Sequence, residues 1–168
     1  MKANFHEAIL RRFHAAGLGF ECVSTGELRR LTALFPGMEP GRILFTPNFA
    51  PREEYREALD LGVMVTLDNL HPLQSWPELF GGREILVRLD PGKGRGHHRY
   101  VHTAGDLSKF GVPADEVPDF AALAAAAGAR VIGLHAHTGS GILTPDNWEE
   151  TARFLVRMAA AFPDVRAL

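Results

Sequence analysis

The stretch Gly19-Phe20-Glu21-Cys22-Val23-Ser24-Thr25-Gly26-Glu27-Leu28 decides the fold of this 168-residue chain. Residues 19–23 form a short, largely apolar run that is typical of a strand. Ser24 followed three residues later by Glu27 is a capping box, which predicts that a helix begins there. The stretch is therefore one βα unit, the repeating piece of an α/β fold.

The βα pattern repeats on both sides of this stretch. Strands are predicted over residues 19–23, 42–46, 63–68, 84–90, from 131 onward, and over 165–168. Helices are predicted over residues 5–16 with Asn4 as the cap, after Ser24, after Pro51, around 70–80 with breaks at Pro72 and Pro77, over 118–127, and after Thr144. The first four strands recur about every twenty residues, and most are continuous apolar runs. Such runs are expected when helices cover both faces of a sheet, so the sheet should be parallel.

The count of elements predicts an incomplete barrel. About six strands and six helices are expected, whereas a closed eight-stranded barrel needs about 250 residues. The predicted fold class is therefore α/β, a partial TIM (β/α)8 barrel, with residues 1–168 forming a single incomplete barrel domain. The alternative is a complete, open, doubly wound sheet. The barrel is favoured because no nucleotide-binding fingerprint follows any predicted strand.

The composition narrows the class of partner. The formal net charge is −2, without the basic footprint of a nucleic-acid-binding protein, so we expect a small-molecule partner. The single cysteine, Cys22, excludes an intramolecular disulfide and is predicted to be a small core residue. No apolar run reaches membrane-spanning length, and the N-terminus lacks the apolar core of a secretion signal. We therefore expect a cytoplasmic protein with no membrane partner.

Active sites of such barrels lie where the strands end, so polar residues that follow each apolar run are candidates. These residues are Lys2, Glu21, Asn48, Asp68, Arg88, His137 and Ser140. A lysine in a barrel mouth can lose its proton near neutral pH and form a Schiff base with an aldehyde cofactor or a carbonyl substrate. The ordinary alternative for Lys2 is a solvated charge close to the N-terminus.

The segment from Val131 to Gly141 combines a buried strand with a polar, glycine-rich loop. His135 and His137 lie two residues apart on the predicted strand and therefore share a face. Gly139 and Gly141 flank Ser140, so a hydroxyl and accessible backbone N–H groups can approach a phosphate closely. The ordinary alternative is a pair of hydrogen-bonded interior histidines beside a turn.

A long polar loop interrupts the βα period at residues 91–114. Loops of this length are usually functional or disordered. Residues 92–96, Gly-Lys-Gly-Arg-Gly, lack the Gly-Lys-Ser/Thr ending of a nucleotide-binding loop. No metal site is predicted at His97, His98 and His102, because no thiolate and no regular helix accompanies them.

Four motifs carry a family resemblance. They are Met1-Lys2-Ala3-Asn4, residues 19–28, Ser108-Lys109-Phe110-Gly111, and residues 133–141. In this order they resemble the barrel domain of the pyridoxal-phosphate-dependent decarboxylases of ornithine, lysine, arginine and diaminopimelate. The Ser-Lys-Phe-Gly and His-x-Gly-Ser elements are most similar to diaminopimelate decarboxylases. Residues 45–72 resemble the decarboxylase half of fused aspartate kinase/diaminopimelate decarboxylases.

The resemblance implies a pyridoxal 5'-phosphate cofactor and specific residue roles. Lys2 is implied to hold the cofactor covalently and to act in catalysis, removing carbon dioxide from meso-diaminopimelate to give L-lysine. His137 is implied to pack against the cofactor ring, and Ser140, beside Gly139, to contact its phosphate. Glu21 stands where the family often has an aspartate near the site, which leaves its role open. Arg88 and Lys109 match positions near the site.

The resemblance also implies that parts of a complete enzyme lie outside these 168 residues. They are the strand before Lys2, the last barrel strands and a C-terminal β domain. In the family the active sites are completed across a homodimer. We therefore expect the isolated chain to bind cofactor weakly and to have little or no activity. Two other functions remain open, a non-catalytic pyridoxal phosphate carrier and an amino-acid racemase.

Overall fold

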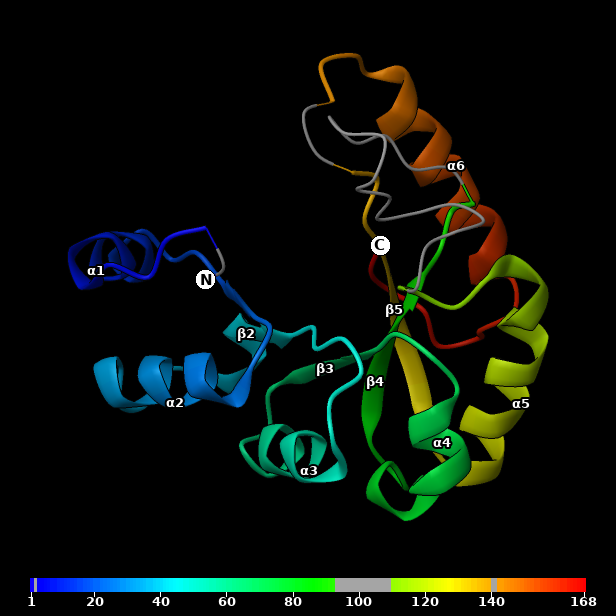
Figure 1. Cartoon of the computed structure of the whole chain (residues 1–168), viewed down its shortest axis with the longest axis horizontal. Coiled ribbons are helices and arrows are strands. Elements are labelled where there is room, and N and C mark those ends of the chain that lie inside the picture. The colour runs from blue at the N-terminus through cyan, green and yellow to red at the C-terminus, as the bar shows by residue number, and fades with distance from the viewer. Residues whose placement is uncertain (2, 93–109, 140–141) are drawn as a thin grey trace. The chain divides into compact units, whose positions relative to one another are not determined.

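The computed structural model describes residues 1, 3–92, 110–139 and 142–168 (Figure 1). The strands are β1 (Phe20–Cys22), β2 (Ile43–Phe45), β3 (Met64–Leu67), β4 (Glu84–Leu89) and β5 (Arg130–Ala136). The α-helices are α1 (Glu7–Ala15), α2 (Thr25–Leu34), α3 (Arg52–Asp60), α4 (His71–Ser75), α5 (Val117–Ala127) and α6 (Asp146–Ala159). The 3-10 helices are η1 (Pro40–Arg42), η2 (Pro77–Leu79) and η3 (Ala114–Glu116).

The strands form a sheet in chain order, β1-β2-β3-β4-β5. β1 pairs with β2, β2 with β3, and β4 with β5, each in parallel. Parallel neighbours joined by helices are the arrangement that the βα repeat predicts, so the α/β fold class is confirmed. None of the helices in the described residues is long and apolar enough to cross a membrane.

The first helix begins later than the sequence suggests. His6, not Asn4, is its N-cap, because the His6 ring Nδ1 accepts the N–H of Ala8 at 3.3 Å. Asn4 instead accepts the N–H of His6 through Oδ1 at 2.9 Å. The Asn4 side chain thus fixes the chain that enters the helix and does not cap it.

The capping box that opens α2 is present with one change of partner. Ser24 Oγ accepts the N–H of Glu27 at 3.4 Å, as predicted. The carboxylate of Glu27 accepts the N–H of Val23 at 2.8 Å, one residue before the cap. The box therefore joins the end of β1 directly to the start of α2.

The predicted helix over residues 70–80 is divided at Pro77, as expected. α4 ends at Ser75 and the separate turn η2 begins at Pro77. The break predicted at Pro72 is wrong. Pro72 lies in the first turn of α4, where a proline is tolerated because its missing N–H has no helical partner.

The predicted strand at residues 165–168 is present only as an isolated bridge. Ala167 bridges Gly133 of β5 in parallel. Leu134 N donates to Ala167 O at 3.1 Å, and Arg166 N donates to Ile132 O at 2.9 Å. The described residues therefore contain five strands where about six were expected.

The chain divides into two compact units, Met1–Thr66 and Leu67–Leu168. In the first unit, Leu28 and Leu31 of α2 and Phe45 of β2 are fully buried. In the second, α5 and α6 lie beside β5 (Figure 1). Phe120 of α5 meets Phe162 edge to face at 6.3 Å between ring centroids. Each unit thus buries its own apolar core.

Cys22 is a buried core residue of β1, as predicted. Burial raises the pKa of its thiol to about 12, and the carboxylates of Glu27 and Glu21 add to this increase. A thiol reagent at pH 8 should therefore react slowly with the folded chain and rapidly once urea has unfolded it. Between the ordinary thiol pKa of about 8.5 and this raised pKa, the thiol ionises only in the unfolded chain. The free energy of unfolding should therefore fall as the pH rises through this range. Equal reaction rates for the folded and unfolded chain would contradict the buried position.

Candidate active site

The predicted site residues divide between the two units. Lys2 and Ser140 lie outside the described residues, as do Lys109 and the loop histidines. Glu21 belongs to the first unit, whereas Arg88, His137 and Gly139 belong to the second. The surroundings of these residues are therefore described for each unit separately.

In the second unit, β4 and β5 present Arg88 and the two histidines on one face. Arg88 is the parallel register partner of His135. Side chains alternate along a strand, so His137, which comes directly after β5, continues the His135 face. The guanidinium of Arg88 and the imidazoles of His135 and His137 are thus gathered at the carboxyl ends of two adjacent strands.

A glycine on β5 makes room for this face. Gly133 is the register partner of Leu86, and a Cβ at Gly133 would lie 2.9 Å from Leu86 Cδ2. Such a contact is closer than carbon atoms approach, so a side chain at 133 would displace Leu86. The Leu86 side chain therefore fills the space below Arg88 and His135.

The loop after β5 turns at Gly139. Its φ of 121° lies in a region that L side chains rarely adopt, so glycine suits this position. His137 and Gly139 are half-buried, and Thr138 between them is buried. That this glycine brings the backbone close to an anion stays a prediction.

The chain returns to the end of β4 after the long loop. Val112 N donates to Arg88 O at 2.8 Å, and Asp90 N donates to Val112 O at 2.9 Å. These two bonds make a parallel bridge between Leu89 and Val112. The Phe-Gly end of the Ser-Lys-Phe-Gly motif is thereby held against the strand that carries Arg88.

Gly111 allows this close return, and an alanine there should be costly. Its φ is 89°, and an added Cβ would lie 2.8 Å from Asp90 N. Gly92 is a matched control, since its φ is 71° and no atom of the described residues lies within 4 Å of its added Cβ. Both substitutions should cost about 1–2 kcal/mol for the left-handed backbone, and only Gly111→Ala should lose further stability through the clash. Urea unfolding of the two variants measures the difference, and equal losses would contradict the close approach.

Phe110 covers Arg88, a contact that the sequence interpretation did not include. The Arg88 Cζ atom lies over the Phe110 ring, 5.2 Å from its centroid. This is a cation–π geometry. The only signal in the sequence was the motif itself, whose phenylalanine and glycine had no assigned role.

In the first unit, Glu21 is linked to β2. Thr46 Oγ1 donates to Glu21 Oε1 at 2.7 Å. The Met1 amino group donates to the Glu21 main-chain carbonyl, so residue 1 lies beside β1. The register of β1 and β2 continues to Thr46, whose N–H donates to Cys22 O at 2.8 Å. Glu21 is therefore held in place by a neighbouring strand.

Thr66 adds a buried hydroxyl at the end of β3. Its side chain is 1% exposed, and within the described part of the chain its Oγ1 has no hydrogen-bond partner. A buried hydroxyl without a partner is costly unless a ligand or water satisfies it. Sequence reasoning missed both Thr46 and Thr66, because each was counted as an ordinary strand residue.

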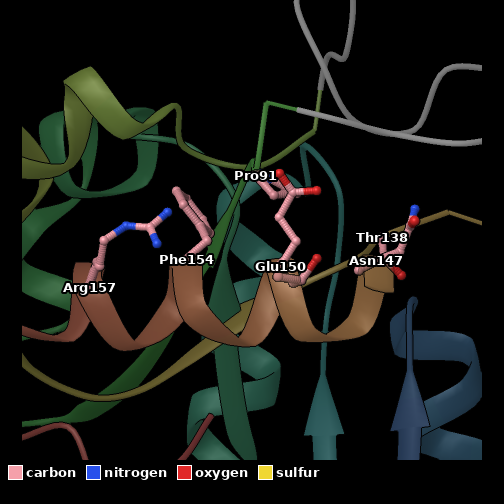
Figure 2. Close-up of a pocket in the computed structure, with 7 residues that line it drawn as sticks. Pro91, Thr138, Asn147, Glu150, Phe154 and Arg157 are labelled. Carbon is pink, nitrogen blue, oxygen red and sulfur yellow. The ribbon is translucent and has the colours of Figure 1, made fainter. Parts of the chain in front are cut away.

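A cavity of about 160 Å³ lies between the end of β5 and α6. Figure 2 shows the α6 side chains that line it. The lining residues are Pro91, Thr138, Asn147, Glu150, Thr151, Phe154 and Arg157. None of them is a predicted site residue, although Thr138 lies between His137 and Gly139 in the sequence.

Comparison with protein families identifies the chain's relatives. The family described as "Pyridoxal-dependent decarboxylase, pyridoxal binding domain" matches residues 1–162. The chain belongs to this family of pyridoxal-dependent decarboxylases. The pyridoxal-binding domain accounts for almost all of its 168 residues.

Two curated relatives of this decarboxylase domain are diaminopimelate decarboxylases. A diaminopimelate decarboxylase of Methanothermobacter thermautotrophicus is 40% identical over 146 residues, 86% of this chain and 34% of that protein. One from Deinococcus radiodurans is 39% identical over 142 residues, 84% of this chain and 36% of that protein. The chain thus spans about a third of the length of these relatives.

Solved decarboxylases share the fold of this domain. A crystal structure of diaminopimelate decarboxylase superposes with a TM-score of 0.84 at 26% identity, over 96% of this chain and 39% of that one. Lysine decarboxylase from Selenomonas ruminantium superposes with a TM-score of 0.76 at 23% identity, over 92% of this chain and 39% of that one, which is a likeness of fold alone. The decarboxylase domain therefore has the fold expected from the βα repeat.

Proposed function

We propose that this chain is the pyridoxal-phosphate-binding domain of a diaminopimelate decarboxylase, which converts meso-diaminopimelate to L-lysine and carbon dioxide. The observation that carries the proposal is the 40% identity over 146 residues to a protein of that name. The structural likeness to another diaminopimelate decarboxylase over 96% of the chain supports it.

The second unit supplies groups that suit a flat, anionic cofactor. The imidazole of His137 offers an aromatic face against which a pyridine ring can pack. Gly139, with its positive φ, and Ser140 offer backbone and hydroxyl donors for the phosphate. Arg88 adds a permanent positive charge on the same face.

The first unit supplies the reactive amine. Lys2 lies outside the described residues, and its role as this amine comes from the family resemblance. Its unprotonated amine would hold the aldehyde carbon of pyridoxal phosphate. The unpartnered hydroxyl of Thr66 fits a site that receives a polar ligand.

The chemistry divides between the cofactor and the chain. When bound, pyridoxal phosphate supplies the electron sink that decarboxylation requires. The chain orients it, with Lys2 at the aldehyde, His137 at the ring and Ser140 at the phosphate. Glu21, held by Thr46, would interact with a positively charged group of the ligand, although the family often has an aspartate at this position.

The expected partners belong to the same proposal. The substrate is an amino acid, and a homodimer completes the site. Residues 45–72 resemble the decarboxylase half of fused aspartate kinase/diaminopimelate decarboxylases, which leaves open whether a kinase half precedes this chain in the same reading frame. Sequencing the region upstream of Met1 tests this last point, since a stop codon directly before it would exclude a fusion.

The substrate can be identified by measuring the carbon dioxide that the protein containing residues 1–168 releases. With pyridoxal phosphate, we expect release from meso-diaminopimelate and not from ornithine or arginine. Preference for ornithine or arginine would move the chain to another decarboxylase of the family. Loss of chirality without carbon dioxide would indicate a racemase, and cofactor binding without reaction would indicate a carrier. The 168-residue chain alone should release little or no carbon dioxide from any of these substrates.

A further inference from the structure

Arg88 is restrained from two directions. Its main chain lies within β4, where Arg88 is the register partner of His135. Its guanidinium lies over the ring of Phe110, with Cζ 5.2 Å from the ring centroid. Phe110 is 22 residues further along the chain, so this contact depends on the return of the loop to the strand.

The main chain around Phe110 is itself fixed to β4. Val112, two residues later, exchanges hydrogen bonds of 2.8 and 2.9 Å with Arg88 O and Asp90 N. Gly111 lies so close to Asp90 N that a Cβ would approach it to 2.8 Å. Because the strand that holds Arg88 also holds the neighbours of Phe110, the ring and the guanidinium keep a fixed relation.

We propose that Phe110 is a positioning residue that holds Arg88 for an anionic oxygen of the ligand bound at the ends of β4 and β5. The proposal rests on the proposed function, because it takes the ligand to be pyridoxal phosphate. It also assigns a role to the phenylalanine and glycine of Ser108-Lys109-Phe110-Gly111.

The chemistry of the pair supports this role. An aromatic ring attracts a cation placed over its face. The N–H groups of a guanidinium lie in its plane, so a ring over one face does not itself block hydrogen bonds through the N–H edges. The ring also limits the rotamers of a long side chain, which lowers the entropy that Arg88 would lose when it binds the anion.

A first experiment tests the contact in the chain without cofactor. In NMR spectra of nitrogen-15-labelled protein, the Arg88 side-chain Nε–Hε signal, assigned by its loss in Arg88→Lys, should be shifted by the Phe110 ring current. Phe110→Leu should remove the shift, and Phe110→Tyr should retain it. An Arg88 signal that does not change in Phe110→Leu would overturn the proposal.

A second experiment tests the consequence for binding. Titration of the unsubstituted chain, Phe110→Leu, Arg88→Gln and the double variant with pyridoxal phosphate gives a double-mutant cycle. Phe110→Leu should weaken binding roughly threefold to thirtyfold, the range of a cation–π contact, and should have no further effect in the Arg88→Gln background. Phe110→Tyr should retain most of the affinity. Equal losses from Phe110→Leu in both backgrounds would mean that the ring acts independently of Arg88 and would overturn the proposal.

Titration with pyridoxal, which lacks the phosphate, identifies the anionic oxygen. A loss in Phe110→Leu for pyridoxal phosphate alone would assign the phosphate, and equal losses for both ligands would assign the ring oxygen. If the protein that contains residues 1–168 binds neither ligand at high concentration, the proposed function fails. The ring-current result then still decides whether Phe110 positions Arg88.

Discussion

Replacing Lys2 by arginine should abolish the covalent attachment of pyridoxal phosphate to this chain. Arginine keeps the positive charge, but its guanidinium stays protonated and cannot act as the amine nucleophile. After incubation with the cofactor and borohydride reduction, mass spectrometry of the intact variant should show no specific pyridoxyl adduct. The unsubstituted chain should carry one adduct.

The chain offers clean controls for this experiment. It contains three lysines, Lys2, Lys93 and Lys109, so each can be replaced by arginine in turn. Lys93→Arg and Lys109→Arg should both retain the adduct. An adduct that persists in Lys2→Arg and disappears in one of the other variants would contradict the assignment of the reactive amine.

Replacing Leu28 by alanine should cause a large loss of stability at a position outside the proposed site. Leu28 lies on α2 and is fully buried. Leucine-to-alanine changes in a core typically cost about 2–5 kcal/mol, because they remove apolar contacts and leave a cavity. Urea unfolding followed by circular dichroism should show a lower midpoint.

Leu143→Ala is the matched control, because it makes the same chemical change at a side chain that is 96% exposed. It should change the free energy of unfolding by no more than about 0.5 kcal/mol. If the two variants lost equal stability, Leu28 could not be part of the core of the first unit.

Most of the fold could be predicted from patterns of residues that are close together in the sequence. The apolar run that ends at Val23 and the capping box of Ser24 and Glu27 predict β1 and α2, because both depend on residues close in sequence. The same reasoning placed β2 to β5 and five further helices. It was less accurate at α1, where the His6 ring competes with Asn4 for the cap position.

Contacts between distant segments were not predictable in the same way. Residues 165–168 have the apolar character of a strand, yet they make only one bridge to β5, because strand pairing depends on the partner as well as on the sequence. The Thr46–Glu21 bond requires the register of β1 and β2, and the Phe110–Arg88 contact requires the path of a long loop. Neither can be read from local spacing.

Candidate site residues could be selected from the sequence where they follow a predicted strand. Strand ends indicated Glu21, Arg88 and His137 as candidates, because parallel strands bring their carboxyl ends to one edge of a sheet. The role of Lys2 came from the family resemblance and remains a prediction, as does that of Ser140. Family membership now supports the cofactor class, whereas the individual residue roles await experiment.

The most direct test of the account is to locate the pyridoxyl group after borohydride reduction of the unsubstituted chain with its cofactor. Four amines can compete, those of Lys2, Lys93 and Lys109 and the N-terminal amino group. Peptide mapping should place the modification on Lys2, at a pyridoxal phosphate concentration where the other three remain unmodified. Modification of another amine in preference to Lys2, or equal modification of all four, would contradict the proposed cofactor site.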